Sequence, residues 1–400
     1  MSGLTPIATV IFCGSRTTRR ANRALTRRSK MHLYSTTSSP RNRIDCGTVR
    51  PSALAVLTLT AISNLISAHG EDWRERTLAF GHHKDRTPGT GERIMLGRLR
   101  PALVCLLALM AILPCSAMAQ TLRPEDLLRV DVPPADHRLA YGADPLQFGE
   151  LRLPQAIGSH AVAIIIHGGC WADRLPGLDP RSTGFEPLRP LAAALTHAGI
   201  ATWNVEYRRV GTLGGGWPGT FEDLARATDF LRIIAPKYDL DLGRVASVGH
   251  SAGGQLALWI AARPKLPAAS PVSTKNALAV RAAVDIDGPP DLASAQPKER
   301  TFCPVSAITR LLDGTPADHP ERYRQSSALA WLPLGLPQTI IVGSLLESAG
   351  DLVTDYRARA NAKGDNVAVI TLNGSGHFGM LLPDTEYAAT VQAEILSLLK

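Results

Sequence analysis

The chain has 400 residues, of which 45% are hydrophobic and 20% charged, and its formal net charge is +8. The charge is unevenly placed, because residues 1–119 carry 17 of the 43 Lys and Arg but only 6 of the 35 Asp and Glu. Residues 120–400 therefore have a net charge of −3. The high isoelectric point gives no indication that the folded part binds nucleic acid.

Residues 95–119 have the pattern of a secretory signal peptide. A short positive segment ends at Arg100, and an apolar run too short for a comfortable membrane span follows over residues 101–113. Ala117 to Ala119 supply the small residues that a signal peptidase reads. We expect Gln120 to begin the mature chain, and the protein to be periplasmic or secreted.

This signal begins far from the first residue of the chain. The simplest interpretation is that residues 1–94 are an untranslated or disordered leader from an upstream start-site assignment. The alternative is a transit peptide over residues 1–45 followed by a weak membrane segment over residues 53–68. Cys115 would suit a lipoprotein, but the preceding Pro114 fits that pattern poorly.

Predicted strands and helices alternate along residues 120–400. The strands are expected at 148–153, 161–166, 200–207, 244–248, 280–285, 338–342 and 367–372. The helices are expected at 188–198, 221–235, 252–263, 355–363 and 385–399. This order predicts the α/β class, a single domain with a mostly parallel sheet and helices on both faces. Residues 265–277 and 289–331 interrupt it and predict loops and short helices over the rim of a site.

The segment Gly249-His250-Ser251-Ala252-Gly253 follows a buried strand and opens a helix. Glycines on both sides of Ser251 allow the sharp turn that exposes a nucleophilic hydroxyl at the top of a sheet. The N-terminus of the following helix favours a developing negative charge. Ser251 is therefore the candidate nucleophile.

A serine hydroxyl needs a base. His377 lies between Gly376 and Phe378 after the last predicted strand, and it is the candidate base, although a solvated loop histidine is the alternative. His250 is expected to be structural because its side chain should point away from that of Ser251.

The segment after the strand at 161–166 predicts an oxyanion hole. Gly168, Gly169 and Cys170 would expose backbone N–H groups there, and Ala252 would supply another. An ordinary Gly-Gly turn is the alternative, and His167 would shape the loop. Trp171 is expected either to line the substrate pocket or simply to pack.

The acid that orients the base is expected after the strand at 338–342. Glu347 is the first candidate because it comes early after that strand, and Asp351 is the alternative. Asp355 is expected to begin the next helix.

Three further features concern structure. Cys170 and Cys303 can form a disulfide in an exported protein, but their spacing leaves the pairing open. Their spacing gives no metal-site pattern. Glu206 can pair with Arg208 or Arg209 to brace the site, or all three can form a solvated turn.

From Phe148 onward the chain resembles the α/β-hydrolase superfamily. It is similar to the kynurenine formamidase, feruloyl-esterase and hormone-sensitive-lipase-like branches. The resemblance rests on H-G-G-x-W, N-V-E-Y-R-R, G-G-G-W-P-G and G-H-S-A-G-G, and it implies the roles given above for Ser251, His377 and the Gly168–Cys170 loop. Many relatives carry G-x-x-D before V-P near the acid, and this chain departs from that pattern.

These features predict a serine hydrolase that cleaves carboxylic esters through an acyl-enzyme intermediate. An arylformamidase or small peptidase would use the same groups, and a non-catalytic binding protein on a hydrolase fold is the alternative from another class. We expect no cofactor and no metal. The partner is a small ester or amide, with no nucleic acid and no stable membrane span in the mature chain.

Overall fold

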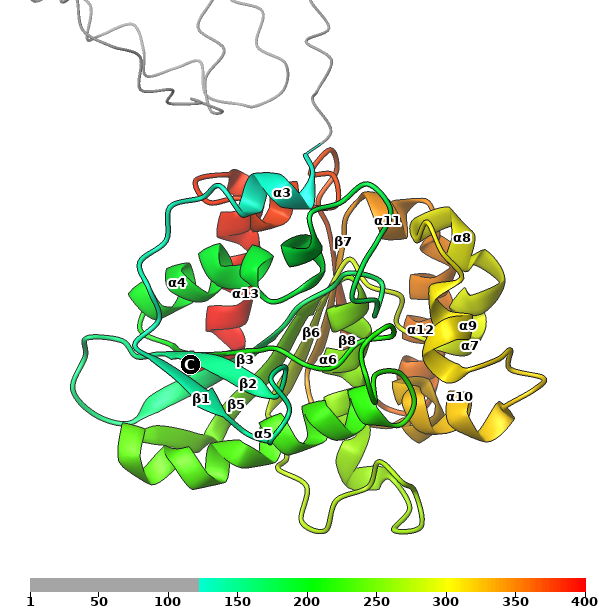
Figure 1. Ribbon diagram of the computed structural model, residues 1–400, viewed down its shortest axis with the longest axis horizontal. Helices are drawn as coiled ribbons and strands as arrows, with labels where there is room; N and C mark the ends of the chain where they lie inside the picture. Colours follow the sequence, from blue (N-terminus) through cyan, green and yellow to red (C-terminus); the bar gives the residue numbers. More distant parts are fainter. Residues whose placement is uncertain (1–121) are drawn as a thin grey trace, which may run out of the picture. The chain divides into compact units, whose positions relative to one another are not determined.

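The computed structural model describes residues 122–400. The predicted leader, the signal peptide and Gln120 lie outside the described residues. In the described part, one eight-stranded sheet has helices packed around it (Figure 1). No helix within this part is both long enough and apolar enough to cross a membrane.

The strands of this sheet follow the order β1-β2-β4-β3-β5-β6-β7-β8. Strands β1 and β2 pair antiparallel, β2 pairs antiparallel with β4, and all other neighbours are parallel. The strands are β1 (His137–Ala140), β2 (Phe148–Arg152), β3 (His160–Ile166), β4 (Ala201–Val205), β5 (Leu240–His250), β6 (Ala282–Ile286), β7 (Gln338–Val342) and β8 (Val367–Thr371).

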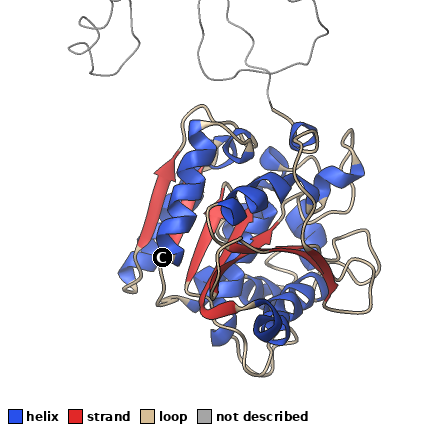
Figure 2. Ribbon diagram, turned by 90° about the vertical axis from the view of Figure 1, so that its left-hand side faces the viewer, coloured by secondary structure: helices blue, strands red, loops and turns tan. Residues whose placement is uncertain are grey.

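Helices cover both faces of the sheet (Figure 2). The longer ones are α4 (Arg189–His197), α5 (Gly219–Tyr238), α6 (Ala252–Ala262), α12 (Gly350–Ala362) and α13 (Glu386–Leu399). The short ones are α3 (Pro124–Leu127), α7 (Leu292–Ala295), α8 (Glu299–Phe302), α9 (Ala307–Leu312), α10 (Pro320–Ser326) and α11 (Ser344–Glu347).

The alternation of side chains in the central strands produces two hydrophobic cores. Ile165 of β3 belongs to the core that also contains residues of α4 and α13. Ile164 and Ile166 belong to the other core, which contains residues of α5, α6 and α12. Because both faces are covered, residues 161–166 of β3 form a continuous apolar run, as the sequence pattern predicted.

The structure confirms the predicted fold class and the seven predicted strands within a few residues. Residues 289–331 form short helices, as expected. Two differences arise at the edges of the prediction. Strand β1 was not predicted, and it is a short edge strand with alternating exposure. Helix α12 begins at Gly350 and not at Asp355.

Candidate active site

Ser251 lies on a tight turn between β5 and α6. Its backbone has φ 56° and ψ −124°, a strained conformation for a residue with a side chain. The turn is held because the Ser251 N–H donates to the Ile286 carbonyl at 2.8 Å. A Cβ atom at Gly253 would lie 2.1 Å from the carbonyl oxygen of Ile166, so a side chain there would push the elbow away from β3. The predicted strand, turn and helix are confirmed.

His377 lies on the loop after β8, at the same edge of the sheet. Its ring Nδ1 donates to Oδ2 of Asp287 at 2.7 Å. Its own carbonyl oxygen accepts a hydrogen bond of 2.8 Å from Nε2 of His250. The first contact fixes the ring and leaves Nε2 as the nitrogen able to take up a proton. The second fixes the main chain of the loop.

Asp287 follows β6 directly and is fully buried. Besides the His377 ring, its carboxylate accepts main-chain N–H groups of Gly343 at 2.8 Å, Leu345 at 3.1 Å and Leu346 at 2.9 Å, all at the start of α11. Burial alone would raise the pKa of Asp287, but the His377 ring and these amides together lower the pKa. The carboxylate therefore stays ionised beside the imidazole.

The structure corrects the predicted position of the acid. Glu347 is exposed on α11, and Asp351 is exposed and pairs with Lys298. The segment after β7 therefore contributes backbone donors instead of the carboxylate. The acid comes from one strand earlier, after β6. One signal in the sequence could have revealed it, since Asp287 stands directly after a buried strand and before glycine.

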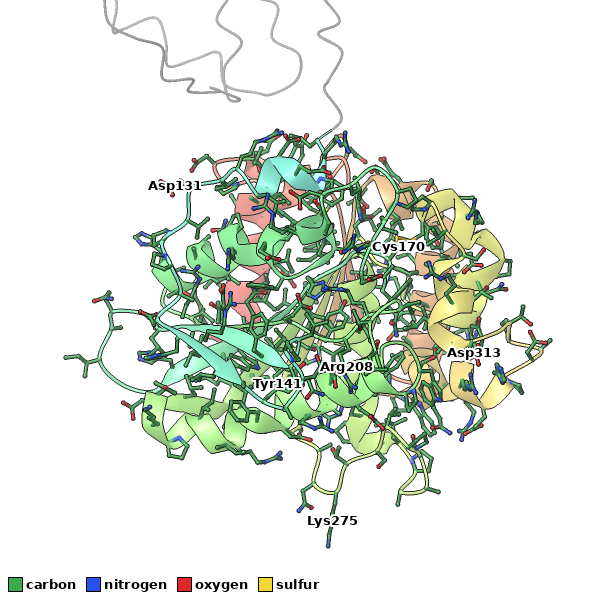
Figure 3. The ribbon with its side chains drawn as sticks, viewed as in Figure 1. Asp131, Tyr141, Cys170, Arg208, Lys275 and Asp313 are labelled. Atoms are coloured by element: carbon green, nitrogen blue, oxygen red, sulfur yellow. A yellow bond between two sulfur atoms is a disulfide. The ribbon has the colours of Figure 1, made fainter. Side chains whose placement is uncertain are left out.

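The predicted oxyanion segment lies next to Ser251, the candidate nucleophile. A Cβ atom at Gly168 would be 2.8 Å from both the His250 carbonyl oxygen and the Ser251 Cβ, so this backbone passes directly against the elbow. Cys170, labelled in Figure 3, continues the segment and has φ 53°. Ala252 is the first residue of α6, which directs the N-terminus of the helix toward the same place.

The two cysteines of the described part form a disulfide between Cys170 and Cys303. Cys303 follows α8, and its neighbours Phe302 and Pro304 both line the cavity described below. The disulfide therefore connects the Gly-Gly segment to the wall formed by the short helices. The pairing that spacing alone left open is confirmed.

A buried polar cluster supports the Gly-Gly segment from behind. Nε2 of His167 lies 3.1 Å from Oε1 of Glu206, and Arg209 donates to that oxygen at 2.6 Å. The His167 ring stacks on Tyr207 with 4.2 Å between ring centroids. Burial would raise the pKa of Glu206, but His167 and Arg209 outweigh it and lower the pKa. The predicted brace by Glu206 is confirmed with Arg209, whereas Arg208 pairs with Asp223.

Trp171 does not line the cavity. It is 1% exposed and packs in the hydrophobic core with the α5 and α6 side chains, so the packing alternative is correct. Its φ of 52° turns the side chain inward, a feature that the sequence does not reveal. His250 lies beside the catalytic candidates with its ring centroid 4.4 Å from that of His377. Burial and then the charge of His377 lower the pKa of His250, so its ring is neutral.

Ser251 and His377 line one cavity of about 370 Å³. Gly168, Gly169 and Cys170 form part of its wall. The rest is mainly apolar, with Leu122, Pro124, Leu175, Leu178, Phe302 and Phe378 among the lining residues. The candidate nucleophile, the candidate base and the Gly168–Cys170 segment thus face a space of the size that small organic molecules occupy.

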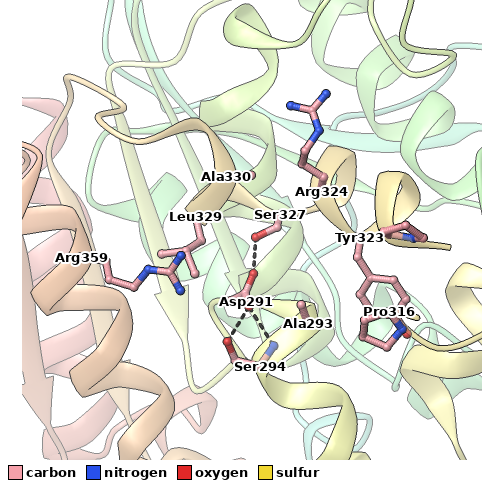
Figure 4. Close-up of a pocket in the computed structure, with 11 residues that line it drawn as sticks. Asp291, Ala293, Ser294, Pro316, Tyr323, Arg324, Ser327, Leu329, Ala330 and Arg359 are labelled. Carbon is pink, nitrogen blue, oxygen red and sulfur yellow. Dashed lines mark hydrogen bonds between the residues drawn. The ribbon is translucent and has the colours of Figure 1, made fainter. Parts of the chain in front are cut away.

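A second cavity of about 460 Å³ lies between the short helices and α12 (Figure 4). The buried Asp291 in this cavity accepts hydrogen bonds from Ser294 and Ser327, so its carboxylate is already paired within the protein. Within residues 122–400, no three His, Cys, Asp or Glu side chains are arranged to hold a metal ion.

The sheet order, the serine elbow and the histidine–aspartate pair define an α/β-hydrolase. Residues 150–345 match the BD-FAE family model. Over these residues the chain is similar to the α/β-hydrolase esterases of this family. A curated relative, kynurenine formamidase of Meyerozyma guilliermondii, is 34% identical over 122 residues. That match covers 30% of this chain and 41% of the relative, less than half of its length.

Solved structures show the same fold. A truncated carbohydrate esterase from gut microbiota has 20% identity and a TM-score of 0.54, over 66% of this chain and 98% of that chain. Esterase B of Lactobacillus rhamnosis, inhibited by a tributyrin phosphonate, has 16% identity and a TM-score of 0.55, over 78% and 96%. A propionate-bound esterase of Thermogutta terrifontis has 16% identity and a TM-score of 0.50, over 69% and 95%.

Proposed function

We propose that the protein cleaves carboxylic esters through an acyl-enzyme intermediate on Ser251. Nε2 of His377 takes the proton of the Ser251 hydroxyl as its oxygen attacks the ester carbonyl, and then returns that proton to the leaving alcohol. Water repeats the sequence on the acyl-enzyme and releases the acid. Asp287 holds the His377 ring in the required tautomer, and this 2.7 Å contact is the observation that carries the proposal.

The negative oxygen of the tetrahedral intermediate would bind main-chain N–H groups. The Gly168–Cys170 segment passes against Ser251, and Ala252 follows Ser251 at the start of α6, so both supply candidates. Donors fixed in place before the reaction need no reorganisation when the charge develops. The buried Glu206–Arg209–His167 cluster and the disulfide keep this segment in position.

A fluorophosphonate probe and p-nitrophenyl acetate test the proposal together. Wild type should be labelled on Ser251 and should turn over the ester, and Ser251→Ala should lose both. Ser159→Ala, which changes an exposed serine, is the matched control and should behave as wild type. Full labelling and turnover by Ser251→Ala would overturn the proposal.

An amide substrate is the second candidate, favoured by the stretch similar to kynurenine formamidase. The same groups can protonate a leaving amine. The ratio of kcat/KM for phenyl formate to that for formanilide distinguishes the two. A ratio well above one supports the esterase, and a ratio below one would favour the formamidase.

We also propose that the protein acts outside the cytoplasm. The signal-peptide pattern and the paired Cys170 and Cys303 support this location, because disulfides persist in oxidising compartments. N-terminal sequencing of the secreted or periplasmic fraction should begin at Gln120. Recovery of the active enzyme only from the cytoplasm would contradict it.

A further inference from the structure

The first residues that the structure describes lie at the cavity that contains Ser251 and His377. We call Leu122–Leu127 the strap. Its last residue, Leu127, is 2% exposed and belongs to the same hydrophobic core as Leu188 and Leu191. The strap is therefore packed into the domain at one end and is not a loose terminus.

Two hydrogen bonds join the strap to residues 175–188. Arg123 donates from Nη2 to the Gly177 carbonyl at 2.9 Å, and the Asp179 N–H donates to Glu125 at 3.1 Å. Residues 175–188 supply several of the apolar side chains in the cavity. The strap therefore stabilises the cavity wall formed by residues 175–188 and adds its own residues to that wall.

The other side of the strap meets the histidine loop. A Cβ atom at Gly379 would lie 3.4 Å from Cδ1 of Leu122, two residues along the chain from His377. Leu122, Arg123 and Pro124 line the same cavity as Ser251. The strap therefore bridges residues 175–188 and the loop that carries the base.

The strap presents an apolar surface to the cavity. Arg123 is its one cation there, but its Nε lies 3.3 Å from a Glu125 carboxylate oxygen, which offsets the charge. Leu122 and Pro124 instead continue the apolar wall that includes Leu178 and Phe378. This surface suits a hydrocarbon group and offers little to an anion.

We propose that the strap is a specificity element of the ester site and that Leu122 limits the size of the apolar group bound there. This inference rests on the proposed function. The acyl and the alcohol parts of an ester can both carry such an apolar group, and the two ester series below distinguish them. A substrate with a larger apolar group would gain affinity until it meets Leu122.

The test compares Leu122→Trp and Leu122→Ala with the matched pair Leu213→Trp and Leu213→Ala, whose side chain is 91% exposed. Kinetics are measured on p-nitrophenyl acetate, butyrate and octanoate, which vary the acyl part. Methyl and naphthyl acetate vary the alcohol part. The readout is the ratio of kcat/KM for the largest to the smallest ester in each series, since a general loss of structure lowers both values alike.

We expect Leu122→Trp to lower this ratio about tenfold in one of the two series, and Leu122→Ala to raise it. The series that shifts identifies the part of the ester at the strap. Unchanged ratios in both series, or equal shifts in the Leu213 variants, would overturn the inference while Ser251-dependent turnover still stood. Absence of that turnover in wild type would instead refute the proposed function.

Discussion

Asp287 and His377 lie 90 residues apart in the chain, and the carboxylate of the first accepts the Nδ1 proton of the second at 2.7 Å. Asp287 directly follows the end of β6, and the loop after β8 brings His377 across the intervening end of β7. The segment after β7 donates main-chain N–H groups to the same carboxylate. Three consecutive strand ends thus build one acid–base pair.

This contact predicts a sharp difference between three carboxylates. Asp287→Asn should lower kcat for p-nitrophenyl acetate by roughly three to four orders of magnitude, because the amide no longer holds the reactive tautomer of His377. Glu347→Gln and Asp351→Asn should stay within about twofold of wild type, since both side chains are exposed. A loss in Glu347→Gln as large as that in Asp287→Asn would show that the acid is misassigned.

The Gly168 backbone lies so close to the turn at Ser251 that adding one methyl group at this glycine should lower activity. Gly168→Ala would place Cβ 2.8 Å from the Ser251 Cβ and the His250 carbonyl, so the loop must shift away from the nucleophile. We expect kcat to fall about 100-fold or more, as when an oxyanion donor is lost, with a smaller change in KM. Gly350→Ala meets no atom within 4 Å and should leave kcat unchanged. Equal kinetics for the two variants would rule out the predicted approach.

The Glu206 cluster predicts a pH-dependent stability. The folded state lowers the pKa of Glu206, so its stabilisation is complete above the unfolded pKa of about 4.3 and is lost as the pH falls through the folded value. Glu206→Gln should reduce the free energy of unfolding by about 3 kcal/mol at pH 7, and this deficit should shrink below pH 4.

Urea unfolding of wild type and Glu206→Gln between pH 7 and pH 3 measures that deficit. Glu347→Gln is the control and should show no deficit at either end, because its side chain is exposed. A deficit that is constant across the range would mean that the carboxylate charge of Glu206 contributes nothing to stability.

The disulfide predicts a further loss of stability on removal. Cys170 and Cys303 are separated by 133 residues, a long loop whose closure restricts the unfolded chain. The double variant Cys170→Ala/Cys303→Ala should lose about 3 to 5 kcal/mol in denaturant unfolding. Treatment of wild type with a reductant should bring its midpoint to that of the variant, and should leave the variant unaffected. An unchanged midpoint in both experiments would contradict the prediction.

Most of the sheet and the nucleophile could be predicted because their signals are local. A buried parallel strand such as β3 is a continuous apolar run, and the turn at Ser251 needs glycine within a few residues. The edge strand β1 lacked such a run, since only alternate residues are covered.

The acid could not be placed because the choice depends on tertiary structure. Strands β6 and β7 end at the same edge of the sheet, and each is followed by a carboxylate within a few residues. Asp287 is buried and Glu347 is exposed, and only this difference in burial shows which of the two carboxylates can orient His377. The direction of the Trp171 side chain likewise depends on a left-handed backbone that the residue type does not favour.

The donors that hold Asp287 belong to the main chain, and this has a consequence for redesign. No polar side chain between residues 343 and 347 is needed to hold the Asp287 carboxylate. Ser344 and Glu347 can therefore be substituted by other residues as long as the helical turn is kept. Position 343 has no such latitude. A Cβ there would lie 2.1 Å from Met380 and 2.8 Å from both the Asp287 carboxylate and the Gly376 carbonyl. A library of variants over this segment should therefore accept many residues at 344 and 347, apolar residues at the buried positions 345 and 346, and glycine alone at 343.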